Sequence, residues 1–298
     1  MTQLQLQLDM TQVSQRWNTK RAFILHEKKW IDKTNYRVEQ IDRSEGKEFV
    51  LKHHYSGSYP AAIIEYGLFE RTGLHQEELV GVIVFSSPVQ PKAGAAYGAE
   101  GEPFCDLGRM ILLDRVPSGG ETYFQSQARR LLSRDKLDAD GRPKYSLILS
   151  YSDPIPRFDA RGRVRFCGHY GASYYEGGAL YVGRASPRTL VLTSDATVLN
   201  ERTMSKLRND ESGATGAYEI LIAYGAPRIR PGEDGRTYYN RAIAEGPFRK
   251  IRHRGNHVYA FPSGGRLTRA RIRDRMDRKI PFPRFTDSPI PLTPGPIV

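Results

Sequence analysis

The stretch from Cys105 to Pro154 decides the fold, because its residue pattern changes twice along the chain. It reads CDLGRMILLDRVP (105–117), ETYFQSQARRLLSR (121–134) and, after a polar turn, YSLILSYSDP (145–154). The first and third pieces have largely apolar interiors and predict buried strands. The middle piece predicts a helix whose single apolar face holds Phe124, Ala128, Leu131 and Leu132. Strand, helix and strand in this order predict a mixed α/β domain in which the helix crosses between neighbouring strands.

The flanking segments extend this pattern. AIIEYGLFE (62–70) and EELVGVIVFSSP (77–88) predict two strands before it, and GALYVGRA (178–185) and RTLVLTS (188–194) predict strands after it. EFVLKH (48–53) is interpreted as a strand that ends in the polar stretch KHHYSGSYP (52–60). We expect a lead-in with a short helix over 1–45, a main domain over 46–240, a basic segment over 241–284 packed on that domain, and a proline-rich tail over 285–298.

Composition limits the compartment and the partners. Two cysteines, Cys105 and Cys167, are too few for a disulfide framework or a cysteine-rich zinc module, which favours a reducing cytoplasm. The sequence has no apolar run of membrane-spanning length, and its first residues lack the pattern of a signal peptide, so we expect no membrane partner. The net charge of +12 and the pI near 9.7 point to a polyanion, with nucleic acid first.

Most of the excess charge lies near the C-terminus. Residues 241–284 contain 13 Lys and Arg against three acids. FRKIRHRGNHVYAF (248–261), where Arg252, Arg254 and His257 alternate with apolar residues, predicts an exposed basic strand. RLTRARIRDR (266–275) predicts a helix that lies along a phosphate backbone. The alternative is a solvated helix whose arginines pair with Asp274 and Asp277. The predicted contacts to double-stranded DNA are Arg249, Lys250, Arg252, Arg254, Arg269, Arg271, Arg273 and Arg275.

Two further motifs have the residue types of a reactive site. Asp153, in SYSDP, lies where a buried strand emerges, which is a usual place for reactive groups in sheets wrapped by helices. The simpler interpretation is that Asp153 caps the following turn, and the sequence alone favours it. FCGHYGASYYEGG (166–178) combines glycines, which let a ligand approach the backbone, with a histidine and tyrosines. A loop packed by its own aromatic residues is the alternative there.

Taken in order, these motifs resemble a known family. KHHYS (52–56), LVGVIVFSSP (79–88), LGRMILLDRVP (107–117), SYSDP (150–154) and GHYG (168–171) are similar to segments of the phage Mom DNA-modification proteins, which resemble GNAT acyltransferases. The resemblance implies a GNAT-like mixed, strongly twisted sheet flanked by helices, here with a basic C-terminal extension. It also implies transfer of an acyl-derived group of the carbamoylmethyl type to the exocyclic amine of adenine, which protects phage DNA from restriction.

The resemblance also implies roles for individual residues. His54, Tyr55 and Asp153 match catalytic positions, with Asp153 or His54 accepting a proton and Tyr55 donating to an oxyanion. The substrate-binding set is Ser56, His169, Tyr174 and Tyr175. The family continues after its tyrosine with a small polar–alanine pair, whereas Tyr175 and Glu176 stand here, which weakens the match of Tyr174. The target amine is hidden in duplex DNA, so the base is expected to flip out and stack on these tyrosines.

The donor and the cofactors are less constrained. Gly119 and Gly120, in RVPSGGET (115–122), could hold an anion at a helix N-terminus, although Glu121 opposes it there. Acetyl-CoA and an aminoacyl carrier are both open as acyl donors. His54, Tyr55 and Asp153 also have the ligand types that suit iron, without a spaced metal motif. Two other classes stay open: a DNA-binding protein without catalysis, and a GNAT-type enzyme acting on a small amine or a protein.

Overall fold

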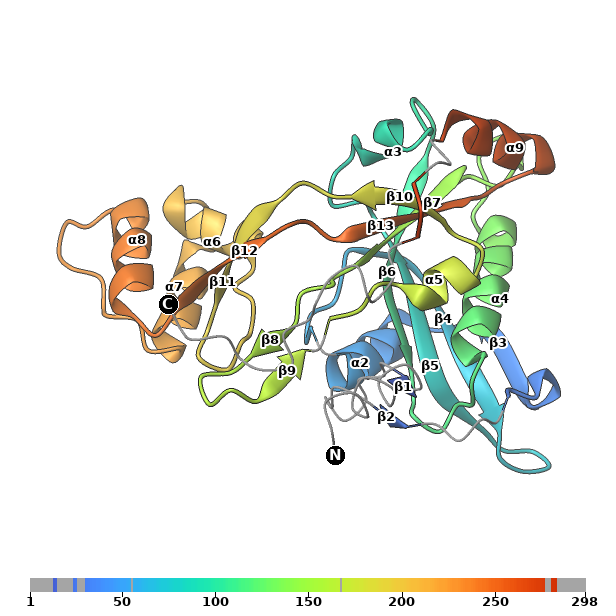
Figure 1. The fold of residues 1–298 in the computed structure, drawn as a ribbon, viewed down its shortest axis with the longest axis horizontal. Coiled ribbons are helices and arrows are strands. Elements are labelled where there is room, and N and C mark those ends of the chain that lie inside the picture. The colour runs from blue at the N-terminus through green and yellow to red at the C-terminus, as the bar shows by residue number, and fades with distance from the viewer. Residues whose placement is uncertain are drawn as a thin grey trace. The chain divides into compact units, whose positions relative to one another are not determined.

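The structure, a computed structural model, describes residues 13–14, 24–25, 30–54, 56–166, 168–276 and 280–282 of the chain. It divides into two compact units (Figure 1). Unit 1 comprises Met1–Ile155, Phe166–Ala185 and Asn256–Ile290, and unit 2 comprises Pro156–Arg165, Ser186–Gly255 and Pro291–Val298. The basic segment 241–284 is therefore shared between the two units.

Unit 1 is built on a seven-stranded mixed sheet in the order β10-β13-β7-β6-β5-β4-β3. The strands are β3 (Tyr36–Gln40), β4 (Ala62–Arg71), β5 (Glu77–Ser86), β6 (Phe104–Leu112), β7 (Leu147–Ser152), β10 (Leu180–Arg184) and β13 (His257–Pro262). Neighbouring strands are antiparallel except β6 and β7, which run parallel. The helices are η1 (Lys33–Asn35), α2 (Arg43–His53), α3 (Ala93–Ala96), α4 (Gly120–Asp135), α5 (Ala172–Glu176) and α9 (Arg266–Arg275), and β1 (Val13–Ser14) pairs with β2 (Ile24–Leu25). The predicted mixed α/β class is confirmed.

The predicted strand–helix–strand unit is β6, α4 and β7. The two strands pair over three positions, the last being Asp106 with Leu149. Beyond it, the pairing partners of β6 lie on β5 and those of β7 lie on β13, so the two parallel strands part. The ladder between β6 and β7 therefore ends at Asp106 and Leu149.

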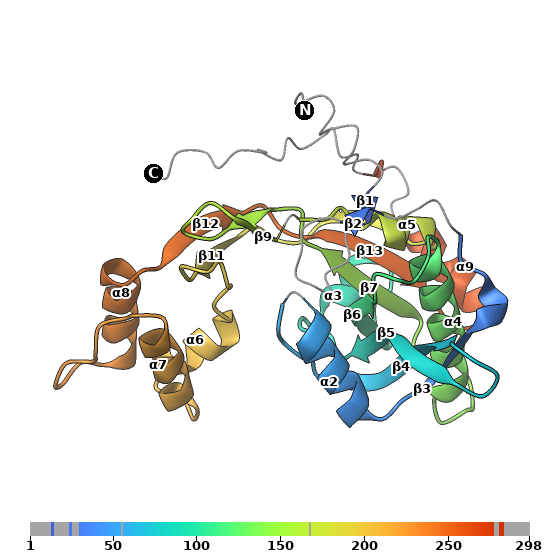
Figure 2. The same ribbon diagram turned by 90° about the horizontal axis from the view of Figure 1, so that it is seen from below.

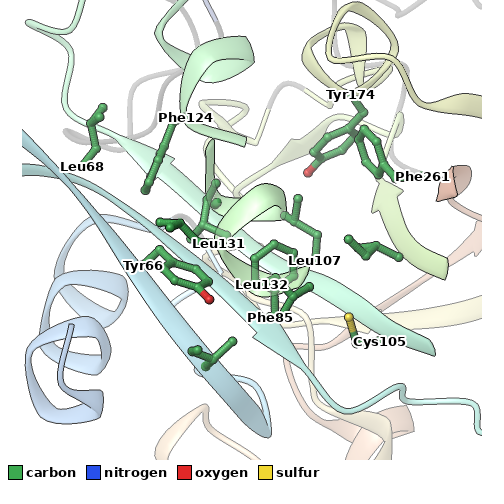
Figure 3. Close-up of a cluster of buried hydrophobic side chains, with 14 of the residues drawn as sticks. Tyr66, Leu68, Phe85, Cys105, Leu107, Phe124, Leu131, Leu132, Tyr174 and Phe261 are labelled. Carbon is green, nitrogen blue, oxygen red and sulfur yellow. The ribbon is translucent and has the colours of Figure 1, made fainter. Parts of the chain in front are cut away.

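Helices cover both faces of this sheet (Figure 2). On one face, α4 buries Phe124, Ala128, Leu131 and Leu132, as predicted, against residues that include Tyr66 and Phe85 (Figure 3). On the other face, α2 packs on Val82, Val84 and Ile111 from β5 and β6. Next to it, Ile272 of α9 and Met276, the residue after that helix, pack on Leu147 and Leu149 of β7. Leu267, at the start of the same helix, is exposed.

The interpretation of EFVLKH as a strand is wrong, because Arg43–His53 is the helix α2. Its buried residues are Gly46, Phe49 and Val50, which recur at helical spacing and face the sheet. A six-residue apolar run does not reveal this period by itself, since short strands and short buried helices look alike.

Unit 2 is a smaller, mainly helical unit. The strands β11 (Arg188–Leu192) and β12 (Arg249–His253) pair antiparallel, and the short strands β8 (Arg157–Phe158) and β9 (Val164–Phe166) form a hairpin, most of which belongs to this unit. The helices α6 (Glu201–Arg208), α7 (Ala214–Ala223) and α8 (Gly235–Glu245) enclose a core around Leu207, Leu221 and Tyr238. In the part of the chain that the structure describes, no helix of either unit has the length and apolar character needed to cross a membrane.

Candidate active site

His54 follows α2 directly, and its imidazole is held in one tautomer. Its backbone N–H bonds the Val50 carbonyl at 2.9 Å and so ends the helix. The Ser56 backbone N–H donates to Nδ1 at 3.1 Å, and the Ser56 Oγ lies 2.8 Å from the same nitrogen. A backbone N–H can only donate, so Nδ1 is an acceptor and the hydrogen of the neutral ring is on Nε2. His54 is 8% exposed, so this ring is fixed inside the protein.

A chain of hydrogen bonds leads from His54 to an arginine on β6. The Ser58 Oγ donates to the Ser56 Oγ at 3.2 Å, and Arg109 donates to the Ser58 Oγ at 2.8 Å and to the Ser58 carbonyl at 3.1 Å. Burial, with the charges of Arg109 and His169, lowers the pKa of His54 well below its usual value. The imidazole is therefore neutral at physiological pH and suited to donating a hydrogen bond from Nε2.

The far end of the KHHYSGSYP loop is anchored separately. The Tyr59 hydroxyl donates to the buried carboxylate of Glu65 on β4, which also accepts from the Arg43 Nε at 3.3 Å. Together with the Arg109–Ser58 contacts, this anchor holds the loop against the sheet on the side of α2. These contacts fix the position of the loop and therefore of the His54 side chain.

Asp153 both caps a turn and belongs to the site. Its Oδ1 accepts the Ile155 N–H at 3.0 Å, which is the turn role that the sequence favoured. Its carbonyl accepts the His169 N–H at 2.8 Å, so the end of β7 is tied to the GHYG loop. Asp153 is 8% exposed, and its charge opposes the lowering of the His257 pKa that burial causes. Asp153 therefore lies next to two histidines.

His169 connects the two halves of the site. Its charge acts on both His54 and His257, and its ring lies 6.3 Å, between centroids, from the ring of Tyr174. The structure thus brings together three of the predicted residues, His54, Asp153 and His169, where β6 and β7 part. Tyr55 lies outside the described residues, so its predicted role stays a prediction.

The two predicted tyrosines of the following loop differ from each other. Tyr174 is buried in the main core, with its ring 5.5 Å from that of Tyr259, and burial raises its pKa. Tyr175 is half exposed, and its ring stacks on Phe282 with centroids 4.4 Å apart. The stacking of a base on either ring stays a prediction.

Two glycines of this loop allow a matched stability test. Gly171 and Gly178 both have positive φ, 75° and 86°, but a Cβ on Gly171 would lie 2.5 Å from the Tyr259 ring, whereas a Cβ on Gly178 would meet nothing within 4 Å. We expect Gly178→Ala to cost only the backbone strain, about 1–2 kcal/mol. Gly171→Ala should cost about 1–3 kcal/mol more because it also overpacks the core. Denaturant unfolding measures both, and equal losses would contradict the contact with Tyr259.

Sequence reasoning placed His257 wrongly. It was assigned to an exposed basic strand, but it is fully buried at the start of β13, between Arg184 of β10 and Ser152 of β7. The predicted strand breaks in two: β12 belongs to unit 2, and β13 is an inner strand of the unit 1 sheet. The apolar run VYAF after His257 was a signal of this burial.

Arg109 and Asp106 were also missed, although each is a charged residue inside an apolar strand. Asp106 is buried at the last paired position of β6 and β7, and its Oδ1 has no hydrogen-bond partner among the described residues. Burial raises the pKa of Asp106 to about 7. A buried carboxyl with this pKa can be neutral or charged under physiological conditions.

The predicted donor cradle lies at the start of α4. Gly119 is the residue before the helix, with φ 84°, and a Cβ there would be 3.1 Å from the Trp30 ring. The Ile31 N–H bonds the Ser118 carbonyl at 2.9 Å, so residues 30–31 pack on this turn. Gly120 is the buried first residue of the helix, and Glu121 lies in its first turn. Donor binding by Gly119 and Gly120 stays a prediction.

A metal site is not assembled by the residues that can be described. No group of three or more His, Cys, Asp and Glu side chains in these ranges is arranged to hold a metal ion. Of the three residues considered for iron, Tyr55 is outside the described part, the Nδ1 of His54 accepts from Ser56, and the Oδ1 of Asp153 accepts from Ile155. Iron at these three residues therefore stays a prediction, and no step below uses a metal.

The predicted DNA contacts fall on two separate elements. On β12, Lys250 and Arg252 are exposed, as is Arg254 just after it, while Arg249 donates to the Phe158 carbonyl at 2.7 Å. On α9, Arg271 and Arg275 are exposed but both pair with Glu102, at 2.9 and 3.2 Å. These two arginines thus pair outside their own helix. Arg269 and Arg273 are also exposed.

The salt dependence of DNA affinity should separate these elements. We expect a slope near −4 to −5 in log affinity against log salt if about half of the ten surplus charges touch phosphate. Serine at Lys250, Arg252 and Arg254 should flatten it by about 2–3 units. Serine at Arg269, Arg271, Arg273 and Arg275 should flatten it by about 2 units, since Glu102 competes for two of them. The exposed Arg142, changed to serine, is the control, and unaltered slopes in both sets would show that DNA is held elsewhere.

Comparison with known proteins adds one finding. The model of the Mom protein family matches residues 35–228, which is more than half of the chain. The matched range contains His54, Asp153 and His169, and it ends before β12, β13 and α9. No curated protein matches the chain.

Proposed function

This chain belongs to the Mom protein family, and from this premise we propose that it transfers an acyl-derived group to the exocyclic amine of adenine in phage DNA. Family membership by itself indicates phage DNA modification, and therefore an enzyme with DNA as its substrate. The observation that carries the finer proposal is the gathering of Asp153, His54 and His169 where β6 and β7 part. The same parting supports a GNAT-like architecture.

The amine needs help to react, because its lone pair is delocalised into the purine ring. In our proposal the amine nitrogen attacks the carbonyl carbon of the donor, and its proton passes to the carboxylate of Asp153. The bond from that carbon to the carrier then breaks, and its electron pair leaves with the carrier. An acyl thioester such as acetyl-CoA, or an aminoacyl ester, supplies the chemistry. This step forms an amide at the adenine nitrogen. The carbamoylmethyl type implied by the family resemblance is joined through its methylene carbon, so it needs a further rearrangement of that product.

His54 is better suited to donate than to accept. Its Nδ1 is occupied by the Ser56 N–H, so the hydrogen of the neutral ring is on Nε2. A neutral imidazole can stabilise negative charge that develops on a carbonyl oxygen. We therefore assign His54 the role of oxyanion donor and Asp153 the role of base.

Nucleoside analysis tests the proposal directly. DNA from cells that express the chain is hydrolysed to nucleosides and analysed by mass spectrometry, with Asp153→Asn as the control. We expect a heavier deoxyadenosine only with the unaltered chain, together with resistance to restriction enzymes whose sites contain adenine. The mass increment identifies the group. Unmodified DNA in cells that contain soluble protein would favour a DNA-binding protein without catalysis, or an enzyme for a small amine or protein.

A further inference from the structure

The imidazole of His257 is oriented by a second relay that resembles the one at His54. The Tyr181 hydroxyl lies 2.9 Å from the Nδ1 of His257. Arg184 acts on Tyr181 through its charge and a hydrogen bond, which oppose the rise in the tyrosine's pKa on burial. A guanidinium only donates, so the phenol oxygen accepts from Arg184, and its own hydrogen is then available to Nδ1. The inference below takes this arrangement, in which the hydrogen of His257 is on Nε2.

The other nitrogen of His257, Nε2, is fully buried, and no hydrogen-bond partner for it exists among the described residues. Burial also lowers the pKa of His257 to about 4, so the ring is neutral. An orphaned buried donor costs stability, and such groups in native proteins call for an explanation such as a ligand.

The surroundings of this nitrogen indicate the chemistry of that ligand. The rings of Tyr170 and Tyr181 lie 5.5 Å from the imidazole, between centroids, and the aromatic cluster continues to Tyr259. Asp153 is the next residue after Ser152, the strand partner of His257. Flat aromatic surroundings, one N–H donor and a neighbouring carboxylate acceptor match a purine that has an amine beside an unprotonated ring nitrogen.

We propose that Asp153 and His257 together recognise the flipped-out adenine: the carboxylate accepts from the exocyclic amine, and the Nε2–H of His257 donates to the adjacent ring nitrogen, N1 or N7. This inference rests on the proposed function, which supplies adenine as the substrate. Guanine places an acceptor oxygen where adenine has its amine, so it would meet the carboxylate unfavourably. Tyr170, whose ring lies against the imidazole, has to move aside when the base enters.

Nuclear magnetic resonance of histidine-labelled protein tests the contact without any turnover. The chain has seven histidines, and loss of one signal in His257→Gln assigns the imidazole. The probe is a duplex oligonucleotide with adenine opposite an abasic site, where flipping is easy. We expect the Nε2–H signal of His257 to move when this duplex binds. The adenine is then replaced by 7-deazaadenine in one duplex and by 1-deazaadenine in another. Only one of the two replacements should abolish the movement, and it identifies whether His257 contacts N7 or N1.

Other results of the titration would overturn the proposal. Saturated DNA binding, verified by fluorescence anisotropy, with an unmoved His257 signal would exclude the contact. Equal movement with both deaza analogues would exclude N1 and N7 as acceptors. If the chain did not bind the duplex, DNA would not be its substrate, and both proposals would be wrong. Unmodified nucleosides despite a moved signal would reject only the proposed chemistry.

Substitutions separate recognition from a structural role. His257→Leu should lower kcat/KM for DNA by about 10- to 100-fold, and His257→Gln, which keeps an N–H near the position of Nε2, should recover most of it. Thermal stability of His257→Leu should not fall, because an orphaned donor is lost and the partly exposed Tyr181 can bond water. The control is His253→Leu in unit 2, which deprives the Gly255 N–H of its 3.0 Å acceptor. It should lower stability and leave turnover per folded molecule unchanged, and the same pattern at His257 would contradict the proposal.

Discussion

Asp153→Asn is expected to lower the rate of DNA modification by about 10²–10⁴-fold, the usual contribution of a positioned general base. Asparagine keeps the oxygen that accepts the Ile155 N–H, so the turn after β7 should survive. It has no basic oxygen to take the proton from the amine. Single-turnover assays on a modifiable duplex measure the rate, and anisotropy should show that DNA affinity falls far less than the rate, because phosphate contacts supply most of the affinity.

Asp159 provides the matched control for this substitution. It is also a buried aspartate in a turn, where its Oδ1 accepts the N–H groups of Arg161 and Arg163, each at 2.9 Å, but it belongs to unit 2. Asp159→Asn weakens its ion pairs with Arg163 and Arg165 and should affect stability more than rate. If Asp153→Asn retained near-normal turnover, Asp153 would be a turn cap and nothing more.

His54→Leu is expected to lower the rate by about 10²–10³-fold, as removal of one oxyanion donor does. The loss should appear in kcat and leave KM for DNA nearly unaltered, because the interaction strengthens only as the oxyanion forms. Ser56→Ala tests the relay. It removes the hydroxyl but keeps the backbone N–H on Nδ1, so it should cost less than about tenfold.

The neighbouring His53 is the control for His54. It is the last residue of α2, and its ring packs on Phe49 one turn earlier, with centroids 4.6 Å apart. His53→Ala should lower stability slightly and leave the rate unchanged. Equal losses from the two substitutions would show that the loop matters as a packed unit and that the imidazole of His54 donates to nothing in the reaction.

The local residue pattern predicts a large part of the fold. The apolar face of α4 and the buried strands β6 and β7 follow from residues that are close in sequence, because a helix or strand of that length shows its own period. The position of Asp153 at a strand end followed from Pro154. Where the run was short, as at EFVLKH, local pattern could not choose between helix and strand, and packing of Phe49 and Val50 on β5 and β6 chose the helix.

The sequence by itself determined the strand–helix–strand unit, the positive charge and the ordered motifs that indicate the family. The tertiary structure alone decided that the strands of that unit part after Asp106, and that His257, far from Asp153 in sequence, lies beside it. It also decided the tautomer of His54, whose Nδ1 accepts the Ser56 N–H. These properties depend on burial and on hydrogen bonds between distant residues, such as Arg109 with Ser58, and no window of neighbouring residues contains them.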